Sequence, residues 1–287
     1  MPELPEVEHT RRNLDRWTRG ARIVRVVTTD ARIVRPLRPS AFVARLEGRT
    51  VRALDRRGKW LRLALDGAGK LFIHLGMTGW FERAGAGGPR NPLLSARADR
   101  ARPLRFERVR FELERRARSS VVVYVDPRRW GRMVLSDEDI APWTTLGPDP
   151  LADGIDVDVL SSALARRSRR AVKEALMDQR VLAGIGNIQA TEALWKAGID
   201  PRSRSGTIDR ARAGDLARAL RWSIRRTLAD LAKGDRADDD PFIAYGHDGE
   251  PCPRCGARFT KVELGGRTTT FCPRCQTRAG MGPSGGA

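Results

Sequence analysis

Residues 252–275, CPRCGARFTKVELGGRTTTFCPRC, contain all four cysteines of a chain of 287 residues. The cysteines form two Cys-X-X-Cys pairs, Cys252 with Cys255 and Cys272 with Cys275, on either side of the 16 residues 256–271. Each pair turns two thiolates toward one point, and tetrahedral Zn²⁺ takes four such ligands. Two disulfides or a redox pair are the alternatives, but neither requires two matched pairs. The spacing therefore predicts a Cys₄ zinc ribbon that binds one structural Zn²⁺.

Between the two pairs, Gly265 and Gly266 predict a tight hairpin turn. Arg267 follows them, so its side chain is expected to reach outward from the tip of the hairpin. Five more cations lie on or beside the ribbon: Arg254, Arg258, Lys261, Arg274 and Arg278. Such a hairpin either contacts a polyanion or is simply solvated, and the spacing alone leaves both open.

The positive charge extends along the whole chain, which has 54 Lys and Arg against 35 Asp and Glu and a net charge of +19. Hydrophobic residues make up 40% of the chain, too many for a disordered polyelectrolyte, so the charge is expected on folded surfaces. Nucleic acid is the polyanion that best fits this excess, with ribosomal or membrane-surface binding as alternatives. A GC-rich genome would favour Arg over Lys but would not raise the total positive charge.

The length allows about two domains of ~100–200 residues each. No stretch approaches the ~18 uninterrupted apolar residues of a transmembrane helix. The N-terminal residues MPELPEVEHTRR also lack the apolar run of a signal peptide. We therefore expect a cytoplasmic protein with no membrane partner.

The first 135 residues read mostly as β-strands. Short runs of alternating or β-branched apolar residues predict strands at residues 22–27, 32–35, 59–65, 70–75, 108–113 and 121–125. Before them, Pro5 suits a first helical turn and apolar residues recur on one face, which predicts a helix over residues 5–17. Many strands with few helices favour a sandwich or barrel. Residues 85–92, GAGGPRNP, predict a flexible loop inside this half.

Residues 136–158 differ in composition, with seven acidic residues, three prolines and no Lys or Arg. This composition predicts an interdomain linker that faces away from any polyanion. Helices are predicted beyond it at residues 172–182, 188–197 and 209–233, the last from a clear amphipathic stripe. The Gly- and Ser-rich residues 280–287 predict a disordered tail.

Pro2 and Glu3 could carry chemistry at the N-terminus. If Met1 is removed, the Pro2 nitrogen becomes a secondary amine with a pKa near ~8, so part of it is an unprotonated nucleophile at pH 7. Its attack on a sugar C1′ would give an iminium that permits elimination, and Glu3 could move the protons. By itself this signal is weak, because an acidic residue at a helix start commonly just favours the helix dipole.

Lys59 stands where a predicted strand begins and is one of only six Lys in a chain dominated by Arg. Lys is a compact, movable cation and a possible proton donor, so its presence hints that Arg would not serve there. Without further evidence, an ordinary surface residue on the strand is the simpler explanation.

Six stretches in this order resemble the formamidopyrimidine-DNA glycosylase/endonuclease VIII family: MPELPEVE, RRGKWL, HLGMTGW, DPRRWGRM, MDQRVLAGIGNIQATEALWKAGI, and YGHDGEPCPRCG with GRTTTFCPRCQ. The opening is similar to the formamidopyrimidine (Fpg, MutM) branch, and the matches span residues 1–276. The resemblance implies an α+β multi-domain fold: an N-terminal β-sandwich with flanking helices, a helix–two-turns–helix domain and a C-terminal Cys₄ zinc-finger hairpin.

The resemblance also implies a bifunctional DNA glycosylase and AP lyase of base excision repair, which cleaves the strand by β,δ-elimination. Its partner would be damaged double-stranded DNA, and it would act as a monomer in the bacterial cytoplasm, associated with the nucleoid. The expected domains are residues 1–135 (catalytic sandwich), 136–158 (linker), 159–240 (helix–two-turns–helix), 241–278 (zinc finger) and 279–287 (tail).

The family implies roles for individual residues. Pro2 matches the nucleophile, and Glu3 the general acid/base that protonates the sugar ring oxygen. Lys59 matches the hairpin lysine near the lesion. Arg267 matches the zinc-finger arginine, which binds a backbone phosphate and is grouped here with the catalytic residues.

The resemblance further assigns residues that bind DNA. Asn187 and His74 match phosphate contacts. Glu6 matches a buried carboxylate near the active site. The wedge that fills the void after base extrusion is expected at Met77, Arg128 and Trp130, where the family usually has Phe in place of the Trp.

Three departures leave the substrate open. Gln189 and Phe271 each replace a frequent Tyr, and the segment between the last predicted helix and the ribbon lacks the loop that covers 8-oxoguanine in Fpg proteins. Removal of 8-oxoguanine is therefore open, whereas ring-opened purines, oxidised pyrimidines and abasic sites remain candidates. The alternatives are an endonuclease VIII-like preference for oxidised pyrimidines and a non-catalytic protein that binds damaged DNA on the same fold.

Overall fold

A computed structural model describes residues 1–28, 30–67, 69–83, 106–234 and 240–278. The chain forms two compact units, residues 1–144 with 228–239 and residues 145–227 with 240–287. The loop predicted at residues 85–92 and the tail at 280–287 lie outside the described residues. Within the described ranges, none of the helices combines the length and the apolar character that a membrane span requires.

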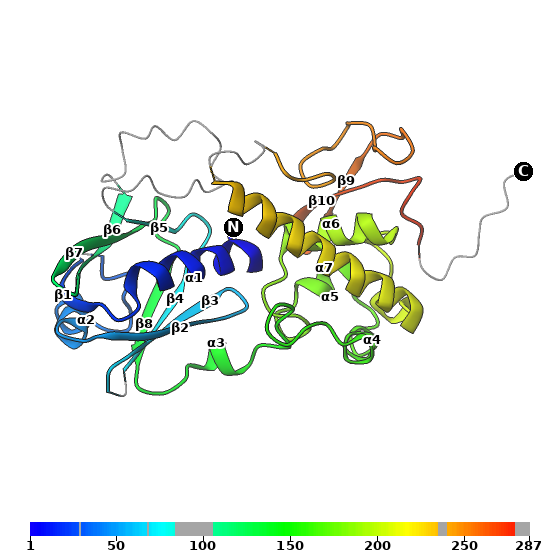
Figure 1. Cartoon of the computed structure of the whole chain (residues 1–287). Helices are drawn as coiled ribbons and strands as arrows, with labels where there is room; N and C mark the ends of the chain where they lie inside the picture. The colour runs from blue at the N-terminus through cyan, green and yellow to red at the C-terminus, as the bar shows by residue number, and fades with distance from the viewer. Residues whose placement is uncertain (29, 68, 84–105, 235–239, 279–287) are drawn as a thin grey trace, which may run out of the picture. The chain divides into compact units, whose positions relative to one another are not determined.

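The N-terminal unit contains two four-stranded antiparallel sheets (Figure 1). One has the order β1 (Arg22–Val27), β6 (Glu107–Arg115), β7 (Arg118–Val125) and β5 (Trp80–Arg83). The other has the order β2 (Val51–Arg57), β3 (Trp60–Leu65), β4 (Lys70–His74) and β8 (Arg132–Ser136). Buried residues of both sheets, such as Phe111 and Leu61, belong to one hydrophobic cluster, which confirms the predicted β-sandwich.

The strands follow the apolar alternation of the sequence. In β3, Leu61, Leu63 and Leu65 are buried, whereas the residues between them are half-buried. Side chains of a strand point alternately to its two faces, so this spacing directs all three leucines into the sandwich. Strands β2, β5 and β8 were not predicted. Of the strands that the sequence predicts, all but one are confirmed.

That exception is residues 32–35, which form turns and not a strand. The Asp30 carboxylate accepts a hydrogen bond from the Arg32 N–H at 3.1 Å, and the Asp30 carbonyl accepts one from the Ile33 N–H at 3.1 Å. The backbone is therefore satisfied locally. Ile33 and Val34 are fully buried, so their apolar character reflects the core and not a strand.

Helices cover the sandwich. The helix α1 (Leu4–Thr18) confirms the predicted N-terminal helix and packs against β2, β3 and β5. The helix α2 (Pro39–Leu46), which was not predicted, packs against β1 and buries Phe42 and Leu46. The single turn α3 (Ala141–Thr144) places Trp143 against Phe72, with ring centroids 5.6 Å apart.

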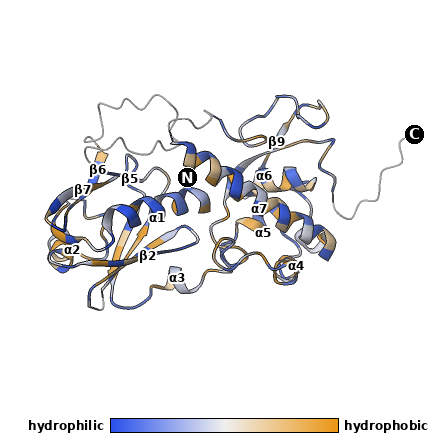
Figure 2. Cartoon of the chain, viewed as in Figure 1, coloured by the Kyte–Doolittle hydropathy of each residue, from blue (hydrophilic) through white to orange (hydrophobic). Residues whose placement is uncertain are grey.

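The second unit is mainly helical. Its helices are α4 (Val157–Ala165), α5 (Val172–Met177), α6 (Asn187–Ala197), the 3₁₀ turn η2 (Ser205–Thr207) and most of α7 (Arg210–Lys233). The helices predicted at residues 188–197 and 209–233 are confirmed to within one residue. The helix predicted over residues 172–182 ends at Met177, and turns follow it. Figure 2 shows hydrophobic and hydrophilic residues recurring along α7, as expected for an amphipathic helix.

The ribbon forms the predicted hairpin. Strands β9 (Thr260–Leu264) and β10 (Arg267–Phe271) pair antiparallel. Gly265 and Gly266 connect them with φ angles of 55° and 69°, a left-handed conformation that favours glycine. The helix α6 packs against β10.

Gln189 and Phe271, the two residues that replace a frequent Tyr, each have a structural role in this unit. Gln189 is fully buried; its Nε2 donates to Thr227 Oγ1 at 3.0 Å and its Oε1 accepts from Ser223 Oγ at 2.8 Å. It therefore joins α6 to α7 by hydrogen bonds. Phe271 is buried beneath the Arg202 guanidinium, which lies 4.5 Å from the ring centroid.

We expect Gln189→Leu to lower the free energy of unfolding by about 1–3 kcal/mol, because it leaves buried hydroxyls of Ser223 and Thr227 without their partner. Urea unfolding followed by circular dichroism measures this loss. Adding Ser223→Ala and Thr227→Val should restore part of it, since both sides of the interaction are then apolar. A Gln189→Leu variant as stable as the wild type would contradict this role.

Candidate active site and DNA-binding residues

The site residues predicted from the sequence fall into two groups, one in each unit. The N-terminal unit holds Pro2, Glu3, Glu6, Lys59, His74, Met77, Arg128 and Trp130. The second unit holds Asn187, Arg267 and the four cysteines.

Pro2 and Glu3 are buried where α1 begins. The Glu3 backbone N–H donates to Glu6 Oε2 at 2.9 Å, one turn further along the helix. Among the described residues, the other carboxylate oxygen of Glu6 has no hydrogen-bond partner. The first turn of α1 therefore holds the Pro2–Glu3 pair against a second, enclosed carboxyl group.

The enclosure of Glu6 changes its ionisation. Burial, followed by repulsion from Glu3, raises the pKa of Glu6 to about 7. A neutral carboxylic acid is less costly to bury than a carboxylate, so Glu6 keeps its proton well into the neutral range. This arrangement limits the negative charge around Glu3.

Glu8 fastens α1 to the sheet. Its carboxylate accepts hydrogen bonds from Arg11 at 3.0 Å, Arg12 at 2.8 Å and Arg56 of β2 at 3.1 Å. Burial alone would raise the pKa of Glu8, but the hydrogen bonds from Arg11 and Arg12 outweigh it and lower the pKa to about 2. The charged Glu8–Arg56 pair thus connects α1 to the hairpin that carries Lys59.

Lys59 lies in the turn between β2 and β3 and is only 7% exposed. It is therefore not the surface strand residue that was the simpler explanation of its position. Its charge acts on His74, at the end of β4, where burial and then Lys59 lower the pKa to about 4.

The His74 ring is consequently neutral at pH 7, and its tautomer is set by a neighbour. The Gly76 N–H donates to His74 Nδ1 at 3.1 Å, so the ring proton lies on Nε2. Trp60 holds the ring from the side, with centroids 5.0 Å apart. The exposed part of His74 is therefore a hydrogen-bond donor without charge, which suits a phosphate contact.

The expected wedge residues come from two turns. Met77 is half-buried in the turn that follows β4. Arg128 and Trp130 are exposed in the turn between β7 and β8, and Trp130 retains 56% of its accessible surface. The Arg128 guanidinium lies 4.7 Å from the Trp130 ring centroid, so the two side chains stack on each other.

A buried carboxylate joins these two turns. Asp126 is completely buried and accepts hydrogen bonds from Thr78 Oγ1 at 2.7 Å and from the Gly131 N–H at 2.7 Å. Tyr124, also buried, donates its hydroxyl to the Leu75 carbonyl at 3.1 Å, and the same hydroxyl lies 3.3 Å from Asp126. The turn that bears Met77 and the turn that bears Trp130 are therefore fixed to each other.

Two glycines are needed for this close approach. A Cβ added at Gly131 would lie 1.7 Å from the Tyr124 hydroxyl, and one at Gly79 would lie 2.2 Å from it. A side chain at either position would not fit without displacing Tyr124. The wedge thus rests on a tightly packed base of fixed shape.

In the second unit, Asn187 is the first residue of α6 and contacts the ribbon. Its Nδ2 donates to the Thr268 carbonyl at 3.1 Å. Lys173 of α5, which is fully buried, donates from Nζ to Asn187 Oδ1 and to Thr269 Oγ1. A single ammonium group therefore joins α5, α6 and β10 and orients the Asn187 amide.

The two turns between α5 and α6 are shaped by Gln179. Its Nε2 donates to the Ile185 carbonyl at 2.7 Å, and its Oε1 accepts from the Gly184 N–H at 2.8 Å. The same Nε2 also donates to the carbonyl of Met177, the last residue of α5, at 2.9 Å, so the side chain joins the end of the helix to the turn at residues 184–185. It also sets the position at which Asn187 begins α6.

Arg267 is exposed at the start of β10, beside the hairpin tip, as the sequence predicts. The four cysteine sulfurs lie within 4.8 Å of one another. Cys255 Sγ and Cys272 Sγ are 3.5 Å apart, and Cys252 Sγ and Cys275 Sγ are 4.0 Å apart. Four thiolates around zinc, with Zn–S near ~2.3 Å, are separated by about 3.8 Å, so the cluster fits the metal.

The pKa shifts differ among the four cysteines. Burial would raise the pKa of Cys252, but the Trp195 side chain and the backbone around Arg254 counter it and lower the pKa to about 7, whereas burial and the neighbouring thiols raise the pKa of Cys275 to about 12. Cys252, Cys255, Cys272 and Cys275 would hold Zn²⁺ in a closed site without a position for water, so the metal contributes folding energy and no chemistry.

Several functional residues were missed by sequence reasoning. Tyr124 and Asp126, which are buried, and Gln179, which is half-buried, act through loop backbones, and nothing in their spacing indicates this. Lys173 had a usable signal, because it is one of six Lys in an Arg-rich chain, the same feature that drew attention to Lys59.

We expect the contribution of Glu6 to the free energy of unfolding to fall as pH rises from about 4.5 to about 7, while His74, whose pKa is lowered to about 4, contributes in the opposite direction. Unfolded Glu6 ionises near its ordinary value of 4.5, whereas folded Glu6 ionises near 7, so the folded state binds the extra proton in this window. The stabilising contribution is complete below the window and lost above it. Glu6→Gln should flatten this dependence in urea unfolding at stepped pH, while the exposed Glu138→Gln keeps the wild-type slope. An unchanged slope in Glu6→Gln would refute the raised pKa.

Three family models match the chain in succession. The formamidopyrimidine-DNA glycosylase N-terminal domain matches residues 1–133, the formamidopyrimidine-DNA glycosylase H2TH domain matches residues 146–236, and the zinc finger found in FPG and IleRS matches residues 249–278. The last match contains all four cysteines, which identifies their cluster as a structural Zn²⁺ site.

Known proteins are similar over the whole length. The formamidopyrimidine-DNA glycosylases of Stutzerimonas stutzeri and Pseudomonas aeruginosa are each 38% identical, over 96% of this chain and 100% of theirs. The structure of Lactococcus lactis Fpg non-covalently bound to DNA with an AP site has a TM-score of 0.81 at 27% identity. MutM in complex with DNA containing carbocyclic 8-oxo-G has a TM-score of 0.80 at 27% identity, and both structures cover 96% of this chain and are covered in full. The chain therefore belongs to the formamidopyrimidine-DNA glycosylase family.

Proposed function

We propose that Pro2 is the nucleophile of this base-excision-repair DNA glycosylase and AP lyase, and that Glu3 is its general acid/base. The observation that carries the proposal is the burial of Pro2 and Glu3 against the enclosed Glu6 at the start of α1. Once Met1 is removed, the Pro2 nitrogen is a secondary amine with a pKa near ~8, far less protonated at pH 7 than a Lys side chain.

The reaction follows from these two groups. The Pro2 nitrogen bonds to C1′ of the damaged nucleoside, the bond from C1′ to the base breaks, and the base leaves with a proton. Glu3 protonates the sugar ring oxygen, the C1′–O4′ bond opens, and the nitrogen electron pair forms an iminium. Loss of a C2′ proton then expels the 3′ phosphate, a second elimination expels the 5′ phosphate, and water releases Pro2.

The DNA backbone would be held by the phosphate contacts. Lys59 supplies a buried cation near the reaction, and neutral His74 donates from Nε2. Asn187, oriented by Lys173, retains a second amide hydrogen for a phosphate. Arg267 contributes an exposed guanidinium from the hairpin, where Arg forms paired hydrogen bonds to phosphate.

Extrusion of the damaged nucleotide requires a wedge, since unstacking costs a few kcal/mol. The stacked Arg128 and Trp130 supply a planar surface in place of the lost base, and Arg128 can hydrogen-bond the orphaned partner base. Met77 adds apolar bulk.

The short connection after α7 bears on which base is removed. Glu192 accepts backbone hydrogen bonds from Ile243, Ala244 and Tyr245 at 3.1, 2.7 and 2.9 Å, so the chain is fixed again soon after α7 ends at Lys233. Few residues remain to enclose an extruded base. We therefore propose that ring-opened purines, oxidised pyrimidines and abasic sites are processed in preference to 8-oxoguanine. We further propose a monomer associated with the bacterial nucleoid, because one chain supplies every residue named above.

Borohydride is expected to trap a covalent complex between the wild-type protein and DNA with an abasic site. It reduces the iminium to a stable amine, which gel electrophoresis detects. Pro2→Gly and Glu3→Gln should reduce excision by at least ~100-fold while DNA binding persists. Absence of trapping by protein whose N-terminus is confirmed as Pro2 would exclude this mechanism and leave a non-catalytic binding protein. A panel of 8-oxoguanine, formamidopyrimidine and thymine-glycol duplexes then tests the substrate order.

Asp126→Asn is expected to slow excision from duplex DNA more than cleavage of a single-stranded abasic site. The variant loses an acceptor that fixes the two wedge turns, and only the duplex reaction needs the wedge. Single-turnover rates on both substrates measure the difference. The exposed Asp137→Asn in the same unit should leave both rates unchanged, and an equal loss on both substrates in Asp126→Asn would refute the positioning role.

A further inference from the structure

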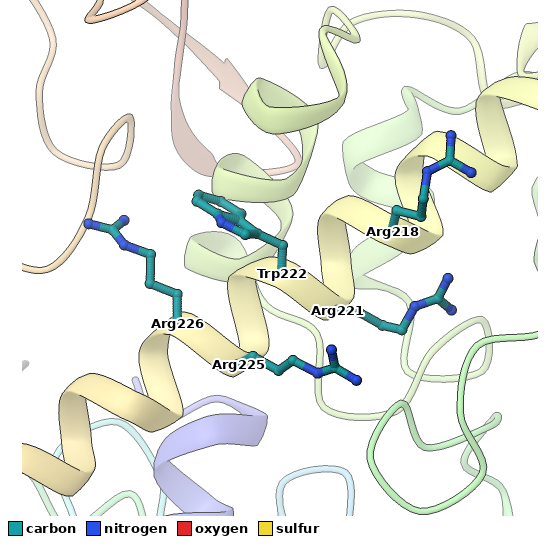
Figure 3. Close-up of a pocket in the computed structure, with 5 residues that line it drawn as sticks. All are labelled: Arg218, Arg221, Trp222, Arg225 and Arg226. Atoms are coloured by element: carbon teal, nitrogen blue, oxygen red, sulfur yellow. The ribbon is translucent and has the colours of Figure 1, made fainter.

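The helix α7 presents a basic face that the reaction does not use. Arg218, Arg221, Trp222 and Arg225 are spaced at i, i+3, i+4 and i+7, which places them on one side of a helix. Together with Arg226 they line a shallow hollow of about 460 Å³ (Figure 3). The motifs that indicate the family do not include this face.

Two of the four arginines that line this hollow, Arg221 and Arg225, lack a carboxylate partner among the described residues, whereas Arg226 lies 3.9 Å from Glu192. Arg218 pairs with Asp215, and Arg221 donates to the Ile155 carbonyl at 3.2 Å. Arg225 is exposed and has no ion pair within the part of the chain that the structure describes. Arg45, which is also exposed, by contrast has a carboxylate partner in Asp137 at 3.0 Å. The face is therefore poised to attract an anion.

Trp222 orders the cations around it. The Lys196 ammonium lies 4.9 Å and the Arg226 guanidinium 5.7 Å from its ring centroid. Such contacts hold long basic side chains in place and reduce the entropy that a ligand would have to remove. Because Trp222 is half-buried and in contact with two cations, it orients charge and is not a platform for base stacking.

The dimensions of the face fit a nucleic-acid backbone. From Arg218 to Arg225 the helix rises about 10 Å, and one strand of B-DNA carries about three phosphates over that length. The number of arginines along this face, three, therefore matches the number of phosphates along the same length of one DNA strand, about three. A small-molecule site would instead need enclosing apolar walls, whereas Trp222 is the single apolar residue that lines this hollow.

We propose that the α7 face formed by Arg218, Arg221 and Arg225 binds the phosphate backbone of duplex DNA as a second contact, independent of the lesion. The inference rests on the proposed function only in that DNA is the partner. It assigns the face to general affinity for duplex DNA, which helps the enzyme to remain on undamaged DNA while it searches.

The test compares two triple variants of equal net charge. R218Q/R221Q/R225Q removes the face, and the control R19Q/R25Q/R45Q removes three exposed arginines that already have partners in Asp15, Glu112 and Asp137. Fluorescence anisotropy with an undamaged 30-base-pair duplex at stepped salt measures affinity and its salt slope. We expect the α7 variant to bind several-fold more weakly and to lower the slope of log K against log[salt] by about 2–3. The control is expected to behave like the wild type.

An unchanged slope in the α7 variant, or an equal loss in both variants, would overturn the proposal. If the triple variant unfolds, R218Q/R225Q is tested instead, because it keeps the Arg221 hydrogen bond to Ile155. This double variant should lower the slope by about 2. Loss of binding to an acidic protein without any change in the DNA slope would reassign the face to a protein partner. Borohydride trapping by the wild type reports the Pro2 chemistry separately, so failure of either idea is recognised without the other.

Discussion

Hydrogen bonds from loop backbones to buried carboxylates are the interaction on which the functional surfaces depend. Asp126 receives the Gly131 N–H and the Thr78 hydroxyl in the interior of the N-terminal unit. A buried donor without a partner costs about 1–3 kcal/mol, so both turns must conform to the position of this carboxylate. The exposed Arg128–Trp130 stack therefore has a fixed base, and its geometry exists before any DNA is bound.

The second unit applies the same principle with other side chains. Burial raises the pKa of Glu192, against the opposing effect of the hydrogen bonds from Tyr245 and Ala244. The cost of burying Glu192 is offset because its carboxylate accepts hydrogen bonds from three successive backbone N–H groups ahead of the zinc ribbon and orders them. In the two turns before Asn187, the Gln179 side chain likewise hydrogen-bonds to backbone groups and holds them in place. Both loops are thus defined by side-chain hydrogen bonds to the backbone, from the buried Glu192 and the half-buried Gln179.

These interactions also mark what the sequence could and could not predict. Strands such as β3 and helices such as α7 are encoded by local periodicity, so they were predicted nearly to the residue. The turns at residues 32–35 and after Met177 were mispredicted, because Asp30 and Gln179 satisfy the backbone through contacts that periodicity does not reveal. The site residues were assigned from family motifs, whereas the groups that position their backbones, such as Asp126 and Gln179, had no motif.

The charged residues also show what the sequence alone can and cannot predict. The excess of Arg indicates a polyanionic partner but does not say which cation has a special role. The two Lys at buried positions, Lys59 and Lys173, stand out because an ammonium group needs only a few acceptors in a small space. A guanidinium brings five N–H donors, and Arg56, with a side chain only 4% exposed, is accommodated by the Glu8 carboxylate and the Gly58 carbonyl. Two of the six Lys, Lys59 and Lys173, thus occupy enclosed sites that suit a compact charge, whereas Lys196, Lys233 and Lys261 are exposed, so the rarity of Lys in this chain does not by itself identify an enclosed site.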